Sequence, residues 1–115
     1  MNYQWHIFWA DLNPTRGSEQ AGRRPVLVIS EEAVNQALPV VTILPLTTYK
    51  KGRTIYPVEF LLDPAKAHLP QASIAMAHQI RAIAKTRLGE PCGYVAEESC
   101  RQGIKNILRL YLDLG

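Results

Sequence analysis

Residues 17–25 read Gly-Ser-Glu-Gln-Ala-Gly-Arg-Arg-Pro, and the apolar run Val-Leu-Val-Ile follows at positions 26–29. The first stretch is typical of a loop that carries a site, because a carboxylate, an amide, a hydroxyl and two guanidiniums lie between or beside two glycines. Glycine adopts backbone conformations that other residues cannot easily adopt, and Pro25 biases Arg24 towards an extended backbone. We predict that Arg24 lies at the mouth of a buried strand. The alternative is a plain polar turn between two strands.

The composition favours one globular domain over residues 1–115, since 47% of the residues are hydrophobic and 20% are charged. A net charge of +3 is too small to indicate a polyanionic partner by itself. The basic residues are clustered, however, in two predicted loops, which hold Arg16, Arg23 and Arg24 and then Lys50, Lys51 and Arg53. Six cations around one surface would suit a phosphate backbone, although basic loops are also often simply solvated.

The two cysteines, Cys92 and Cys100, have neither redox-pair nor zinc-site spacing, and the three histidines do not cluster with them. We therefore predict reduced thiols, no metal site and no cofactor. The N-terminus lacks the pattern of a signal peptide, and Thr42 and Pro45 interrupt the longest apolar run. These features predict a cytoplasmic protein without a membrane span.

Alternating apolar residues and turn signals predict a series of short strands. The expected strands cover residues 5–11, 25–30, 40–46, 55–62 and 73–83, with a further short one at 93–95. Residues 63–71 and 86–93 are expected to be loops because prolines and glycines punctuate them. Ser30 is expected to cap a short helical turn.

Residues 97–112 are predicted to form a C-terminal helix. Apolar residues recur there at three- and four-residue spacing, at Cys100, Ile104, Ile107, Leu108 and Tyr111. Gly103 lies inside this helix at a cost of roughly 1 kcal/mol relative to alanine. Five to six strands and one terminal helix favour a mainly β fold, a small and strongly bent antiparallel sheet or half-open barrel.

Five segments carry a resemblance to a known family. They are Phe-Trp-Ala-Asp-Leu-Asn-Pro-Thr at 8–15, the stretch 17–30, Leu-Pro-Leu-Thr-Thr at 44–48, Gln-Ile-Arg-Ala-Ile-Ala-Lys-Thr-Arg-Leu at 79–88 and Leu-Arg-Leu-Tyr-Leu-Asp-Leu at 108–114. In this order the chain resembles the MazF/PemK family of toxin endoribonucleases, the mRNA interferases of type II toxin-antitoxin systems.

The resemblance implies an SH3-like barrel, similar to CcdB and PemK, that forms a homodimer with RNA in a groove at the interface. It also implies metal-independent, sequence-specific cleavage of single-stranded RNA such as mRNA, and inhibition by a cognate antitoxin.

RNA cleavage without a metal uses the 2′-hydroxyl as nucleophile and leaves a 2′,3′-cyclic phosphate and a 5′-hydroxyl. A guanidinium matches phosphate oxygens in two-pronged geometry, so Arg24 is the candidate that stabilises the phosphorane. Thr47 can donate a hydrogen bond to the same phosphate. Both match the catalytic arginine and threonine of the family, and Glu19 matches its loop glutamate, which would orient or deprotonate the 2′-hydroxyl. The groups that move the remaining protons stay unassigned.

Nine further residues are expected to contact RNA or to hold the loops that do. They are Ser18, Gln20, Arg16, Arg23, Lys50, Lys51, Arg53, His78 and Gln79.

The chain departs from the family at two places. His78 and Met76 stand where many relatives use an acidic residue and a second site residue, and Trp5-His6 stands where Gly-Asp is common. His78 can act as an acid or base near neutral pH, but a lone histidine on a strand is more often a structural hydrogen-bonding group.

Two other functions remain open at this point. One is a gyrase poison of the CcdB type, which shares the fold. Those proteins depend on a tryptophan near the C-terminus, whereas this chain ends Leu112-Asp113-Leu114-Gly115. The other is a non-catalytic RNA-binding module, which would bind with salt-dependent affinity but cleave nothing.

Overall fold

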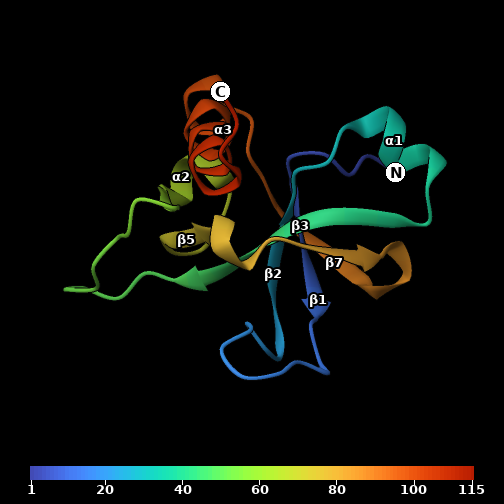
Figure 1. Ribbon diagram of the computed structural model, residues 1–115, viewed down its shortest axis with the longest axis horizontal. Helices are drawn as coiled ribbons and strands as arrows, with labels where there is room; N and C mark the ends of the chain where they lie inside the picture. The colour runs from blue at the N-terminus through green and yellow to red at the C-terminus, as the bar shows by residue number, and fades with distance from the viewer.

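The computed structural model describes residues 1–115 and consists of one seven-stranded antiparallel sheet with helices at its ends (Figure 1). The strands follow the order β4-β5-β3-β2-β1-β7, and β6 pairs with β3 outside this path. The elements are β1 His6–Asp11, β2 Arg23–Val28, α1 Glu32–Ala37, β3 Val40–Thr48, β4 Glu59–Leu62, α2 Pro64–Ala67, β5 Ser73–Met76, η1 Ala77–Gln79, β6 Arg81–Ala84, η2 Lys85–Arg87, β7 Leu88–Tyr94 and α3 Glu98–Leu112.

The strand β3 joins the two halves of the sheet (Figure 1). Its first residues pair with β6, its middle with β2 and its last three with β5. This arrangement confirms the mainly β fold with a C-terminal helix, although the sheet has seven strands where five or six were expected. None of the helices has both the length and the apolar character needed to cross a membrane.

The expected strand at 73–83 is wrong as a single element. The 3-10 turn η1 divides it into β5 and β6, which pair with opposite ends of β3: Ala75 lies opposite Leu46, and Ala82 lies opposite Thr42. Alternation of apolar residues continues through the turn, so the sequence pattern concealed the break.

The expected loop at 86–93 is also wrong, because β7 occupies Leu88–Tyr94 and η2 the residues before it. β7 is an edge strand that pairs with β1 through register shifts. An edge position with irregular pairing tolerates Pro91, which has no backbone N–H to donate. The proline and glycines therefore mark an irregular strand here, and the separate short strand at 93–95 is not present.

Several boundaries differ from the expectation. The strand expected at 25–30 is β2, so Arg23 and Arg24 lie in the strand and not in the loop before it, and β3 extends two residues beyond the expected end, to Thr48. The strand at 55–62 shortens to β4, and the loop at 63–71 contains α2, which Asp63 caps by accepting a hydrogen bond from the Ala65 N–H at 2.9 Å. Glu31, and not Ser30, caps α1 by accepting from the Val34 N–H at 3.0 Å. The Ser30 hydroxyl instead accepts a hydrogen bond from the β3 backbone, at Thr42 N, 3.0 Å away.

The C-terminal helix α3 confirms the expected helix within one residue, and Cys100, Ile104 and Ile107 bury its apolar stripe against the β4–β5 half of the sheet. Leu108 is partly buried and packs against the same core, whereas Tyr111, the last residue of the expected stripe, is 44% exposed. Close packing explains the glycine at position 103, because a Cβ atom there would lie 2.1 Å from Cε1 of Phe60. The glycine thus lets α3 approach β4 closely.

Candidate functional site

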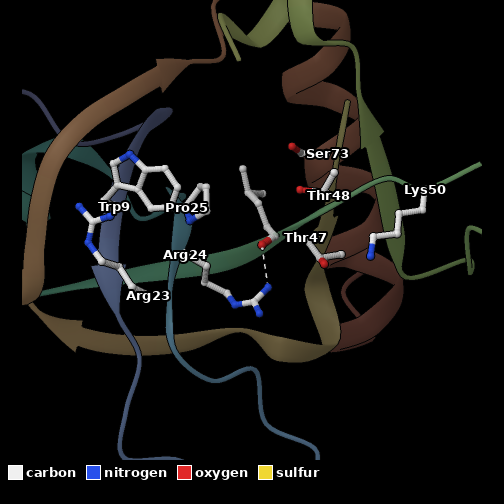
Figure 2. Close-up of a pocket in the computed structure, with 9 residues that line it drawn as sticks. Trp9, Arg23, Arg24, Pro25, Thr47, Thr48, Lys50 and Ser73 are labelled. Atoms are coloured by element: carbon white, nitrogen blue, oxygen red, sulfur yellow. Dashed lines mark hydrogen bonds between the residues drawn. The ribbon is translucent and has the colours of Figure 1, made fainter. Parts of the chain in front are cut away.

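A surface cavity of about 370 Å³ opens where β2 begins and β3 ends (Figure 2). β2 and β3 are antiparallel neighbours, with Val26 opposite Pro45, so the first residues of β2 lie beside the last residues of β3. The cavity is lined by Trp9, Arg23, Arg24, Pro25, Leu46, Thr47, Thr48, Lys50 and Ser73. Two of the three predicted catalytic residues, Arg24 and Thr47, therefore share this cavity, which is called the Arg24 cavity below.

The guanidinium of Arg24 is held in place by the backbone. Its Nε donates to the Ala21 carbonyl at 3.0 Å. Its Nη1 donates to the Leu46 carbonyl at 3.3 Å, the bond dashed in Figure 2. A guanidinium has five N–H donors, so several remain available for an anion in the cavity. The sequence predicted Arg24 at a strand mouth, and the structure adds that β3 and the loop fix its orientation.

Thr47 lies opposite Ile74 of β5 and is only partly buried, with no hydrogen bond from its hydroxyl to another protein group. Figure 2 shows its side chain near the Arg24 guanidinium. The hydroxyl is therefore free to donate a hydrogen bond to a ligand that Arg24 holds. Thr48 and Ser73 also line the cavity, and sequence reasoning did not assign them to the site. The Thr-Thr pair at a strand exit was the signal that could have included Thr48.

Trp9 was likewise missed as a site residue, because its place in an alternating strand predicted only packing. Its indole forms one wall of the Arg24 cavity, and the guanidinium carbon of Arg23 lies 4.7 Å from the ring centroid. A cation over an aromatic face is an attractive contact. Arg23, one of the predicted RNA contacts, is thus positioned beside Arg24 with Lys50 on the same cavity.

Glu19, the third predicted catalytic residue, lies outside the Arg24 cavity. It lines a smaller cavity of about 140 Å³ together with Gln20, His78 and Gln79. The Glu19 side chain is exposed, and its Oε1 accepts a hydrogen bond from the Arg16 N–H at 2.5 Å. The structure therefore places Glu19 in one cavity with the predicted RNA contacts of η1, and outside the cavity that Arg24 and Thr47 line.

The loop between β1 and β2 is tied to η1 by Gln79. Its Oε1 accepts from the Gln20 N–H at 3.1 Å, and its Nε2 donates to the Ser18 carbonyl at 3.1 Å. The loop also uses the conformations expected of its glycines, since φ is +56° at Gly17 and +79° at Gly22. The positive φ angles of the two glycines and the side-chain amide of Gln79 together shape the loop that carries Glu19.

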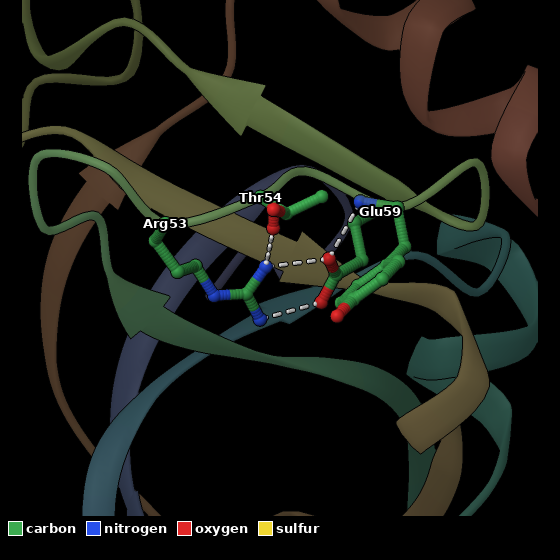
Figure 3. Close-up of polar contacts among 4 residues, drawn as sticks. Arg53, Thr54 and Glu59 are labelled. Carbon is green, nitrogen blue, oxygen red and sulfur yellow. Dashed lines mark hydrogen bonds and ion pairs between the residues drawn. The ribbon is translucent and has the colours of Figure 1, made fainter.

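The second basic loop holds two lysines without an ion-pair partner and one arginine that is paired within the protein. Lys50 lines the Arg24 cavity and Lys51 is exposed beside it. Arg53 instead forms a two-pronged ion pair with Glu59, with Nη1 to Oε1 at 2.7 Å and Nη2 to Oε2 at 2.9 Å, and it also donates to the Thr54 carbonyl (Figure 3). Its positive charge is therefore engaged within the protein.

The carboxylate of Glu59 is almost completely buried. The hydrogen bonds from Arg53 lower the pKa of Glu59 below its ordinary value, against the effect of burial, which raises it. The Tyr56 N–H donates a further hydrogen bond to this carboxylate at 3.0 Å and also lowers its pKa. The exposed ring of His78 is close enough for its charge to act in the same direction.

Cys92 and Cys100 are both free thiols, as predicted. Burial raises the pKa of Cys92, with a smaller opposing effect from the charge of Arg23. The Cys92 thiol therefore stays protonated near neutral pH and is a poor nucleophile. No three His, Cys, Asp or Glu side chains lie close enough together to hold a metal ion.

The protein is a mainly β domain in which one antiparallel sheet packs against a C-terminal helix, with a cationic cavity where β2 begins and β3 ends. Residues 3–112 match the family of PemK-like, MazF-like toxins of type II toxin-antitoxin systems, and the chain belongs to this family. The resemblance noted from the sequence is confirmed.

Individual relatives agree with this assignment. The chain is 35% identical over 113 residues to endoribonuclease MazF9 of Mycobacterium tuberculosis, in a match that covers 94% of this chain and 93% of that protein. A crystal structure of MazF from Deinococcus radiodurans matches 96% of each chain at 28% identity, with a TM-score of 0.79. A mycobacterial endoribonuclease solved with its cognate antitoxin matches with a TM-score of 0.81 at 23% identity, covering 100% of this chain and 98% of that one, which supports the fold.

Proposed function

We propose that this protein is an endoribonuclease toxin that cleaves single-stranded RNA. The observation that carries the proposal is the Arg24 cavity, in which a guanidinium fixed by two backbone carbonyls lies beside the free hydroxyl of Thr47. Membership of a toxin family and similarity to a relative named as an endoribonuclease support the same activity. Two further cations on the cavity, Arg23 and Lys50, suit an RNA backbone.

The bonds between heavy atoms that form and break in the proposed reaction all lie within the RNA. The 2′-hydroxyl oxygen attacks its neighbouring phosphorus, the bond from phosphorus to the 5′-oxygen breaks, and the products are a 2′,3′-cyclic phosphate and a 5′-hydroxyl. The free N–H groups of Arg24 and the Thr47 hydroxyl donate to the phosphate oxygens, where negative charge increases in the transition state. Donors held in place before the reaction stabilise that charge without reorganising.

Glu19 is the proposed group that orients or deprotonates the 2′-hydroxyl. Its carboxylate accepts one hydrogen bond, from the Arg16 N–H on its own loop, and is otherwise exposed, so a substrate hydroxyl can reach it. Glu19 and Arg24 line different cavities, which reach the neighbouring residues Pro45 and Leu46. The scissile nucleotide would therefore have to lie between the two cavities for both groups to act on one phosphate. The proton that the 5′-oxygen takes up is not assigned to a protein group.

Residues 1–115 would act as one domain in the cytoplasm, as a homodimer that a cognate antitoxin inhibits. The family description, a toxin of a type II toxin-antitoxin system, supports the antitoxin partner. Five further predicted RNA contacts are exposed or partly exposed, and are therefore available to a long substrate: Arg16, Ser18, Gln20, Lys51 and His78.

The test is to incubate the wild-type protein and an Arg24→Ala variant with a long unstructured RNA in EDTA, and to map the cut sites and end groups. Arg109→Ala is the matched control, because Arg109 is exposed on α3 and lines neither cavity. We expect cyclic phosphate ends at a short recurring sequence, with Arg24→Ala slower by about 100-fold or more. No cleavage by a folded wild-type protein would refute the activity and favour a gyrase poison or a binding module.

A further inference from the structure

A further cavity, of about 210 Å³, adjoins the Arg24 cavity at Trp9. It is lined by Trp9, Pro25, Thr48, Leu69, Pro70, Gln71, Ser73 and Cys92. Because Trp9, Pro25, Thr48 and Ser73 line both cavities, the two are parts of one continuous surface. The new cavity is called the Leu69 cavity below.

The two cavities differ in charge. The Arg24 cavity has three cationic side chains, Arg23, Arg24 and Lys50, whereas no charged residue lines the Leu69 cavity. A phosphate group would therefore favour the Arg24 cavity. The Leu69 cavity offers the indole of Trp9 and the apolar side chains of Leu69 and Pro70, which suit a flat, neutral group.

The Leu69 cavity also has polar groups that can form directional hydrogen bonds with a ligand. Gln71 is exposed at its edge, and its side-chain amide makes no hydrogen bond within the protein. An amide has both donors and an acceptor, which is the combination that can read the edge of a base. The Ser73 hydroxyl donates to the Gln71 carbonyl at 3.2 Å and can still accept a hydrogen bond.

We propose that the Leu69 cavity binds the base of a nucleotide next to the phosphate held by Arg24, with Trp9 and Leu69 enclosing the base and Gln71 contacting its edge. This inference rests on the proposed function and adds a specificity site to it. Single-stranded RNA is recognised mainly by bases that leave the stack, contact aromatic side chains and form hydrogen bonds through their edges. A neutral base beside an anionic phosphate matches the change from cationic to uncharged lining across Trp9.

The test uses a short RNA that contains the mapped cut site, together with a set of RNAs of the same sequence that each lack one base. The value of kcat/KM is measured for wild type, Leu69→Ala and Gln71→Ala on every RNA, and thermal melting checks that each protein is folded. Gln71 is exposed, so its replacement should leave the fold intact even if Leu69→Ala does not. Leu61→Ala is the matched control, because Leu61 is 41% exposed on β4 and lines neither cavity.

We expect removal of one particular base next to the cut to lower kcat/KM of the wild type by about 5- to 150-fold, as for the removal of one stacked base. The same removal should cost Leu69→Ala and Gln71→Ala clearly less, while Leu61→Ala should behave like the wild type. Cleavage with equal losses in all four proteins at every position would refute the base site and leave the endoribonuclease activity standing. Absence of cleavage in the wild type would refute the activity and the base site with it.

Discussion

The side-chain oxygen of Gln79 accepts a hydrogen bond from the backbone N–H of Gln20 at 3.1 Å, although 59 positions separate the two residues in the chain. The same amide donates to the Ser18 carbonyl at 3.1 Å. Gln79 lies at the end of η1, where the chain turns from β5 to β6. The break in that predicted strand therefore places an amide where it holds the loop that carries Glu19.

Replacement of Gln79 should impair cleavage through the loop. Gln79→Ala removes both hydrogen bonds, and Gln79→Glu keeps an acceptor for Gln20 but removes the donor to Ser18. Each hydrogen bond is worth about 1 kcal/mol, so we expect kcat/KM to fall by about 5- to 30-fold in Gln79→Ala and by less in Gln79→Glu. Proteolysis within residues 16–22 should become faster in parallel. Unchanged proteolysis with reduced cleavage would support direct RNA contact by Gln79 instead.

His78 should matter less to cleavage than Arg24. Its exposed ring lines the cavity of Glu19 and not that of Arg24, whereas Arg24 is aimed at the proposed phosphate position. We expect His78→Ala to lower kcat/KM by much less than the roughly 100-fold of Arg24→Ala. Single-turnover cleavage of one defined RNA compares the two variants directly. A larger effect of His78→Ala would reverse the assignment of roles.

The lysines of the second basic loop should contribute to the salt dependence of RNA binding. Lys50 and Lys51 have side chains available to solvent or to the Arg24 cavity, whereas Arg53 is paired with Glu59. For single strands the slope of log K against log salt changes by about 0.7 for each phosphate that the protein no longer neutralises. We expect that change in Lys50→Ala and Lys51→Ala, with the cut sequence unaltered.

Arg53→Ala is the informative comparison for the same titration, because the sequence predicted an RNA contact there too. Little change in slope would agree with the internal ion pair, and a change equal to that of the lysines would support the contact predicted from the sequence.

Glu59 should make the stability of the fold depend on pH. Its pKa in the folded protein lies below the ordinary value of 4.5, owing mainly to the hydrogen bonds from Arg53. The unfolded chain therefore binds a proton at higher pH than the folded one. The stabilisation is complete above about pH 4.5 and is lost as the pH falls through the lowered pKa.

Thermal melting between about pH 2 and pH 7 tests this dependence in wild type and Glu59→Gln. The variant should be less stable by about 1 to 3 kcal/mol at neutral pH and should lose less on acidification. Identical pH profiles for the two proteins would show that other carboxylates control acid unfolding.

Local patterns in the sequence predicted much of the fold. Apolar residues at helical spacing located α3, and the loop with Gly17 and Gly22 before an apolar run located Arg24 at the start of β2. The alternation of apolar residues gave a wrong prediction for β5 and β6, and the prolines and glycines gave a wrong one for β7. In each case the missing information was which strand the segment pairs with. Backbone pairing with distant residues decides a strand, and no local pattern encodes its partner.

The sequence by itself determined the mainly β fold, the C-terminal helix and the residue types of the proposed RNA-cleaving site, because periodicity, glycine conformations and guanidinium chemistry are local properties. Only the tertiary structure decided which of those residues meet. Antiparallel pairing of β2 with β3 brings Arg24 to Thr47, whereas Glu19 lies on a separate cavity and Arg53 is neutralised by the buried Glu59. The partner of a side chain depends on the course of the whole backbone. The uncharged cavity beside Trp9 depends on it too, because its lining comes from five separate strands and a loop.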